Sequence, residues 1–144
     1  YYCYSNQNNI IDYCIHVRYF GWYYQHGELD DIEENMFNDL NNWYNKYHKP
    51  IILSEFGTDT IEGLHAIPPV VFSEEYQKES IERCCKAFDR ADFCIGEHVW
   101  NFADFKTKQG LTRVNGNRKG VFTRDRQPKL VAHYLKERWA KNEG

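Results

Sequence analysis

The segment PIILSEFG, at residues 50–57, places one carboxylate at the end of a run of aliphatic residues. Such a run is typical of a buried strand, and the ends of parallel strands are where α/β barrels keep their reactive groups. A carboxylate there can attack a substrate as a nucleophile or transfer a proton. Glu55 is therefore the first residue that we expect to be catalytic.

Three strand-then-helix units, repeating at roughly forty-residue spacing, would position this carboxylate. The three strands are expected at residues 10–17, about 50–55 and 93–100. The first helix is expected at residues 28–47, the second begins after Ser73 and the third begins at Pro128. Strands that alternate with helices predict parallel βαβ units. Long loops follow the strands and short loops precede them, as in a TIM barrel, where the long loops build the site.

The expected fold class is therefore α/β, in the form of a partial (β/α)8 TIM barrel. Three units cannot close an eight-stranded barrel, and alone they would leave unpaired strand edges. We expect residues 1–144 to be part of a larger domain. A doubly wound sheet is the structural alternative, but no glycine-rich phosphate loop supports a nucleotide-binding version of it.

Composition narrows the classes of function. Aromatic residues make up 17% of the chain, with 11 Tyr and 4 Trp, which suits a site that stacks on sugar faces, although an aromatic core explains part of this content. The net charge of −3 does not suggest a nucleic-acid or membrane surface. The five cysteines show no zinc or redox spacing, and reduced thiols favour a cytoplasmic location.

Four segments together resemble the C-terminal catalytic portion of the β-glucuronidases in glycoside hydrolase family 2. They are RYFGWY at 18–23, ILSEFG at 52–57, GEHVWNFADF at 96–105 and NRKGVFTRDR at 117–126. The resemblance implies that residues 1–144 supply the last three βα units of an incomplete glycosidase barrel domain. It also implies a homo-oligomeric full-length protein that acts on glucuronide small molecules or glycans, without a metal or other cofactor.

The resemblance assigns the chemistry of the first segments. Glu55 matches the nucleophile of a retaining double displacement, in which two carboxyl groups act on one glycosidic bond. Tyr19, Tyr23 and Trp100 match aromatic positions around the sugar, although each could instead be core packing. A hydroxyl of Tyr19 or Tyr23 could donate a hydrogen bond that keeps Glu55 ionised.

The last segment carries an Asn-x-Lys motif, Asn117 and Lys119, that resembles the family's reader of the glucuronate carboxylate. An ammonium and an amide donor can together compensate the single negative charge of a sugar acid. Arg113, four residues earlier, could add a charge or brace the loop. A solvated basic loop would contain the same residues and is the alternative.

A partner acid is not evident in the sequence. The family places its acid/base in an Asn-Glu pair on an earlier strand, and the only such pair here is Asn142–Glu143, near the end of the sequence. Glu97, in the third expected strand, fits better as a carboxylate that orients its neighbours or pairs with an arginine. We therefore expect the acid/base upstream of Tyr1 and an isolated chain that is inactive.

Two other functions remain open at this point. A related enzyme of the same family could act on a β-galactoside or a β-galacturonide. A noncatalytic carbohydrate-binding remnant could keep the pocket without the acid.

Overall fold

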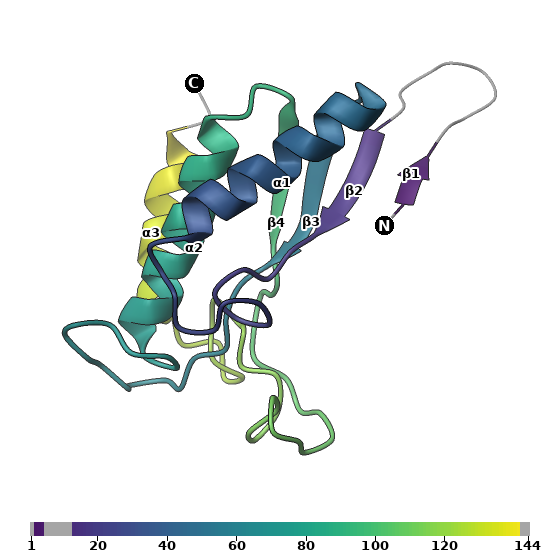
Figure 1. The fold of residues 1–144 in the computed structure, drawn as a ribbon. Helices are drawn as coiled ribbons and strands as arrows, with labels where there is room; N and C mark the ends of the chain where they lie inside the picture. The colour runs from purple at the N-terminus through teal and green to yellow at the C-terminus, as the bar shows by residue number, and fades with distance from the viewer. Residues whose placement is uncertain (1, 5–12, 142–144) are drawn as a thin grey trace. The chain divides into compact units, whose positions relative to one another are not determined.

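A computed structural model describes residues 2–4 and 13–141. Its elements are, in chain order, β1 (Tyr2–Tyr4), β2 (Tyr13–Val17), α1 (Ile32–Tyr47), β3 (Ile51–Phe56), α2 (Glu74–Asp89), β4 (Cys94–Val99) and α3 (Leu130–Ala140) (Figure 1). Strands and helices alternate from β2 to α3, which confirms the three expected βα units. None of the described helices is long and apolar enough to cross a membrane.

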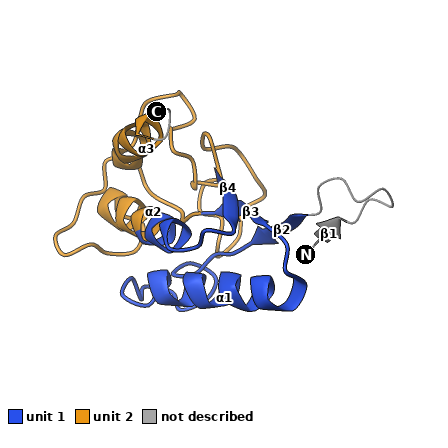
Figure 2. Ribbon diagram, turned by 90° about the horizontal axis from the view of Figure 1, so that it is seen from above, with its two compact units in different colours: residues 1–56, 83–99 blue, residues 57–82, 100–144 orange. Residues whose placement is uncertain are grey.

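The chain divides into two compact units (Figure 2). The first comprises residues 1–56 and 83–99, and the second comprises 57–82 and 100–144. The boundary crosses α2, so the beginning of this helix belongs to the second unit and its end to the first.

The first unit holds a four-stranded sheet in the order β1-β2-β3-β4. β2, β3 and β4 are parallel, as the βαβ pattern predicts, while β1 pairs with β2 in the antiparallel direction and was not expected from the sequence. In this register Val17 of β2 lies opposite Glu55 of β3, next to an irregularity in the pairing. The C-terminal end of β2 is therefore beside the candidate nucleophile.

Helix α1 covers this sheet with a stripe of buried side chains. Ile32, Met36 and Leu40 follow one another at four-residue spacing and are fully buried. Burying an aliphatic side chain of this size contributes roughly 1.5–3 kcal/mol. Tyr44 adds an aromatic contact, because its ring stacks on that of Phe93 with 4.2 Å between the ring centroids.

The second unit is built largely from the long segments that follow the strands. The carboxamide of Gln77, a buried residue of α2, ties these segments together by donating to the carbonyls of Thr58, Lys119 and Gly120 at 3.2–3.3 Å. Glu74 links them to α3, because its carboxylate accepts from the backbone N–H of Leu130 at 2.6 Å. These segments are thus held at defined positions by side-chain hydrogen bonds.

Several expected element bounds were wrong. The first helix starts at Ile32 instead of residue 28, because Ile32 N–H bonds to the carbonyl of Leu29, three residues back, in a turn. The last helix starts at Leu130 and not at Pro128, because the Lys129 N–H bonds to the Val121 carbonyl and keeps the chain extended. Residues 10–12, expected in the first strand, lie outside the described residues.

Candidate functional site

Glu55 lies at the end of β3 and is partly buried. The Tyr19 hydroxyl donates to Glu55 Oε2 at 2.8 Å, and the backbone N–H of Arg18 donates to the Glu55 carbonyl at 3.0 Å. The segment after β2 is therefore fixed to the end of β3 through both the side chain and the backbone of Glu55. A carboxylate with a donor of this kind is held in one orientation.

Tyr23 joins this group through an aromatic contact. Its ring meets that of Tyr19 edge-on, with 5.1 Å between the centroids. Tyr23 is 43% exposed, so its ring also offers a surface to solvent. Tyr19 thus links the two residues, because its hydroxyl contacts Glu55 and its ring contacts Tyr23.

Asp39 of α1 fixes the end of β2 and the residue before Tyr19. The sequence had not singled it out. Its carboxylate receives Arg18 through two bonds, Nε at 2.7 Å and Nη2 at 2.9 Å, and also contacts Nε2 of the buried His16. Burial favours a higher pKa for Asp39, but the hydrogen bonds from His16 and Arg18 outweigh it, so the pKa lies below its usual value. Asp39 is therefore an anion, and it holds Arg18, the residue directly before Tyr19, in place.

Lys119 is fully buried in the second unit and forms an ion pair with Asp59. The Lys119 Nζ donates to Asp59 Oδ1 at 2.9 Å, and Asp59 is only 2% exposed. The same oxygen accepts the Arg118 backbone N–H at 3.3 Å, and Nη1 of Arg113 lies 3.7 Å from Asp59 Oδ2. Asp59, which was also missed from the sequence, thus lies within 4 Å of the side-chain nitrogens of two cations, Lys119 and Arg113.

Asn117 lies beside this ion pair and is 3% exposed. Its carboxamide oxygen accepts the backbone N–H of Lys119 at 3.1 Å, which leaves the NH2 group as the donor that a ligand could use. The turn before it needs a glycine: Gly116 has a φ of +113°, and a Cβ there would lie 2.5 Å from the Phe105 carbonyl oxygen. The Asn-x-Lys motif therefore directly follows a turn whose shape requires a glycine.

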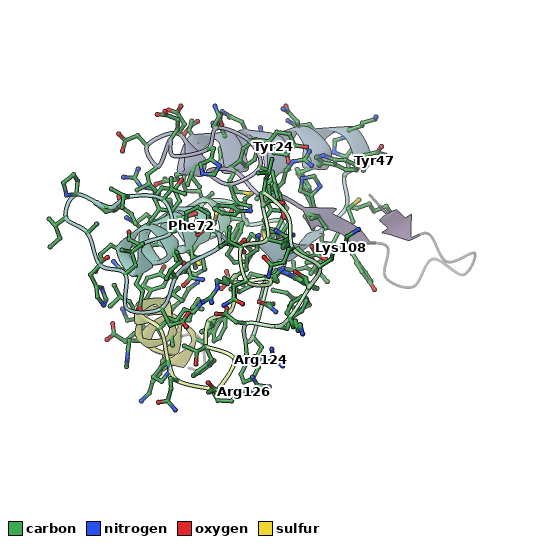
Figure 3. All side chains as sticks on the ribbon, turned by 90° about the horizontal axis from the view of Figure 1, so that it is seen from below. Tyr24, Tyr47, Phe72, Lys108, Arg124 and Arg126 are labelled. Carbon is green, nitrogen blue, oxygen red and sulfur yellow. The ribbon has the colours of Figure 1, made fainter. Side chains whose placement is uncertain are left out.

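The remaining cations of this segment lie at the surface. Arg124 and Arg126 are exposed neighbours on the turn before α3 (Figure 3), and Nη1 of Arg126 donates to the Arg124 carbonyl at 2.7 Å. A solvated loop describes these two residues well. It does not describe Lys119, whose ammonium is buried against a carboxylate.

Trp100 follows β4 and is partly buried, with its ring edge-on to Phe105 at 6.3 Å between centroids. A cleft of about 550 Å³ also lies in the second unit. Its lining includes Glu62, Asp104 and Arg118 but none of the seven site residues expected from the sequence.

A second buried ion pair in this unit joins Asp104 and Lys129. Lys129 Nζ donates to Asp104 Oδ1 at 2.8 Å and to the Arg118 carbonyl at 3.0 Å. Burial raises the pKa of Asp104 and lowers that of Lys129, and in each case it outweighs the attraction of the partner. This pair resembles Asp59–Lys119 in burial and geometry.

The structure thus brings the expected site residues together in two groups, one in each unit. Tyr19, Tyr23 and Glu55 meet in the first unit. In the second, Asn117 lies beside Lys119, and Asp59 links Lys119 to Arg113. Trp100 is in contact with Phe105 in the second unit.

Residues 2–143 match the family model described as glycosyl hydrolases family 2, TIM barrel domain. The chain belongs to this family. This family 2 chain is 56% identical over 122 residues to a β-glucuronidase of Paenibacillus borealis, which covers 85% of the chain and 20% of that protein. The chain thus spans about one fifth of the length of this relative.

Solved structures agree with this family 2 assignment. A β-D-glucuronidase of Dictyoglomus thermophilum has a TM-score of 0.87 and 59% identity, covering 90% of this chain and 22% of that one. A β-glucuronidase of Ruminococcus gnavus in complex with uronic deoxynojirimycin has a TM-score of 0.82 and 49% identity, covering 87% of this chain and 22% of that one. The parallel βα units are therefore part of a family 2 TIM barrel.

The signals for the two missed carboxylates differ. Asp59 follows Glu55 by four residues and stands between two threonines, so a short polar stretch directly after the strand marks it. Asp39 lies among other polar residues of an amphipathic helix, where nothing in the sequence distinguishes it. Among the described residues, no group of three or more His, Cys, Asp or Glu side chains could hold a metal ion.

Proposed function

We propose that this chain is the C-terminal portion of the catalytic barrel of a retaining β-glucuronidase, with Glu55 as its nucleophile. The observation that carries the proposal is the hydrogen bond from the Tyr19 hydroxyl to Glu55 Oε2, 2.8 Å long, at the end of a parallel strand. The β-glucuronidases among its relatives support the substrate class. Because the chain spans about one fifth of such a relative, the proposal concerns a longer protein.

The proposed reaction has two displacements. Glu55 attacks the anomeric carbon, the bond to the aglycone oxygen breaks, and an acid upstream of this chain gives that oxygen its proton. The resulting glycosyl ester on Glu55 is cleaved by water, which loses a proton to the same upstream group. The Tyr19 donor orients the Glu55 oxygen that carries charge at the start and end of each cycle.

The specificity of the proposed enzyme lies in the second unit. A glucuronate differs from a glucoside by one carboxylate, and charged or amide donors are needed to bind it. Lys119 and the NH2 group of Asn117 are such donors, with Arg113 close to the same carboxylate of Asp59. We assign the sugar carboxylate to these three residues and the sugar face to Tyr23 and Trp100.

The nucleophile can be tested by trapping. A 2-deoxy-2-fluoro-β-glucuronyl fluoride should form a stable ester in the full-length protein, since the fluorine slows the second displacement. Digestion and mass spectrometry should then find the added uronyl mass on the peptide that contains Glu55. A Glu97→Gln variant should still be labelled and a Glu55→Gln variant should not. Labelling of another carboxylate would refute the assignment of the nucleophile.

The same proposal predicts no turnover by the 144-residue chain alone, because the acid/base lies elsewhere. Hydrolysis of an aryl glucuronide by the purified chain would contradict it. In the full-length protein, galactoside turnover faster than glucuronide turnover would instead indicate the related enzyme, and binding of glucuronides without turnover would indicate a carbohydrate-binding remnant.

A further inference from the structure

Lys119, the proposed ligand of the substrate carboxylate, already forms an ion pair with Asp59. Lys119 Nζ already has an anionic partner at 2.9 Å, and both side chains are at most 3% exposed. An ammonium whose charge is compensated in this way attracts a second carboxylate less strongly than an isolated one. The role of Asp59 therefore has to be explained together with that of Lys119.

The charges around Asp59 give a simple balance. Lys119 and Arg113 each carry one positive charge, and both have a nitrogen within 4 Å of the Asp59 carboxylate. The third nearby cation, Arg118, pairs through its side chain with Glu62. The charges of Asp59, Lys119 and Arg113 thus sum to +1, which one uronate carboxylate would balance.

Asp59 is also held rigidly. The Thr60 N–H donates to the Arg118 carbonyl at 3.0 Å, so the backbone after Asp59 is bonded to the backbone before Lys119. The amide of Gln77 donates to the carbonyls of Thr58 and Lys119, each at 3.3 Å, which ties the two segments from the other side. The ammonium of Lys119 is therefore placed by Asp59 within a fixed frame.

We propose that Asp59 is a positioning and specificity-determining residue: it fixes the ammonium of Lys119 in the orientation that reads the substrate carboxylate. This inference rests on the proposed function, since it assigns Asp59 a role through the carboxylate reader. Asp59 does not react with the sugar. It acts on binding of the substrate carboxylate, and only through Lys119.

A purely structural ion pair would give different results. Losing a structural pair lowers the amount of folded enzyme, and this changes the rates of all substrates by the same factor. The ratio of kcat/KM for 4-nitrophenyl β-D-glucuronide to kcat/KM for 4-nitrophenyl β-D-glucoside does not depend on the folded fraction. This discrimination ratio therefore separates positioning from folding.

The experiment compares variants of the full-length protein by this ratio. Asp59→Asn should lower it roughly tenfold to a hundredfold, the range expected when a binding group is displaced by about 1 Å. Asp104→Asn is the matched control, because it removes the charge of the other buried Asp–Lys pair, 2.8 Å long, and should leave the ratio unchanged.

A double variant tests whether Asp59 acts through Lys119. If it does, Asp59→Asn should not change the ratio further in a Lys119→Gln background. This double variant removes both charges of the pair, so it also avoids a lone buried charge and keeps the test available if Asp59→Asn alone does not fold. If Asp59→Asn lowers the ratio by the same factor with and without Lys119→Gln, the inference is wrong.

The outcomes separate this inference from the proposed function. If the unaltered protein does not prefer the glucuronide, the proposed function fails and the role of Asp59 fails with it. If the protein prefers the glucuronide and Lys119→Gln removes this preference while Asp59→Asn keeps it, only the inference about Asp59 fails. A loss in both single variants without a further loss in the double variant supports it.

Discussion

Tyr19 Oη lies 2.8 Å from Glu55 Oε2 and donates a hydrogen bond to it. Tyr19 occupies this position because Arg18, directly before it, is bound on both sides. Its backbone N–H donates to the Glu55 carbonyl at 3.0 Å and its guanidinium is held by Asp39. The relationship between the phenol and the carboxylate is thus supported from β3 and from α1.

Tyr19→Phe should lower kcat for an aryl glucuronide by roughly tenfold to a hundredfold in the full-length protein, since a hydrogen bond to a charged group is worth about 1.5–3 kcal/mol. The ring and its contact with Tyr23 remain, so the fold should not change. The measurement is steady-state kinetics. Tyr47→Phe, on an exposed tyrosine at the end of α1, serves as the control and should leave kcat unchanged. An unchanged kcat in Tyr19→Phe would remove Tyr19 from the site.

Lys119→Ala should lose glucuronide turnover far more than galactoside turnover. The ammonium compensates a charge that only the uronate carries, so its loss costs binding of that carboxylate, about 1.5–3 kcal/mol or roughly tenfold to a hundredfold in kcat/KM. Parallel measurements with the two nitrophenyl glycosides give the two losses. Equal losses would mean that Lys119 stabilises the fold without reading the carboxylate. Arg124→Ala removes an exposed cation of the same segment and should change neither substrate.

Asp39→Asn should make the protein less stable at neutral pH but not in acid. The pKa of Asp39 is lowered below 3.8 in the folded state, because the bonds from His16 and Arg18 outweigh the effect of burial. Its contribution is therefore present above the unfolded pKa and is lost as the pH falls through the folded pKa. The expected loss at pH 7 is about 1–3 kcal/mol.

Thermal unfolding at pH 7 and at successively lower pH values would check this expectation. The difference in Tm between the original protein and Asp39→Asn should shrink as the pH falls. Asp30→Asn is a suitable control, because Asp30 also pairs with an arginine, Arg83, but is 95% exposed. It should have little effect at any pH. A constant difference for Asp39→Asn would show that its charge does not carry the effect.

The regular part of the fold could be predicted from the sequence because it follows from local patterns. Hydrophobic periodicity predicted α1, and the stripe of Ile32, Met36 and Leu40 is buried as expected. Ser73 predicted the start of α2, and its hydroxyl does accept the Tyr76 N–H at 3.1 Å. The predicted start of α3 was wrong, since it depends on a backbone bond from Lys129 to Val121, eight residues earlier in the loop before the helix, which helix propensity does not reveal.

The candidate site was predictable only in part, for the same physical reason. Glu55, Asn117 and Lys119 stand in recognisable segments, whereas their partners are defined by contacts across the sequence. Asp59 and Lys119 are 60 residues apart, and nothing in the composition of either segment predicts an ion pair between them. Pairing of this kind depends on the loops that follow different strands, which local propensity does not determine.

Lys129→Met should destabilise the protein strongly at neutral pH, by about 3–5 kcal/mol, because it leaves the carboxylate of Asp104 buried without its cation. The pKa of Asp104 is already raised by burial, even though Lys129 lowers it. Because the pKa of Asp104 is higher in the folded state, Asp104 favours folding at pH values below its unfolded-state pKa of 3.8. This contribution is lost as the pH rises through the folded-state pKa. Removing Lys129 moves that loss further toward neutral pH.

The destabilisation by Lys129→Met should therefore shrink on acidification, since Asp104 then becomes protonated and needs no partner. Tm measured between pH 7 and pH 4 would show the two curves converging. Lys78→Met is the matched control in the same unit, because Lys78 also pairs with a carboxylate, that of Glu82, but its side chain is 38% exposed. Its effect should be small and independent of pH. A pH-independent loss in Lys129→Met would mean that the apolar stem of Lys129, not its charge, stabilises this unit.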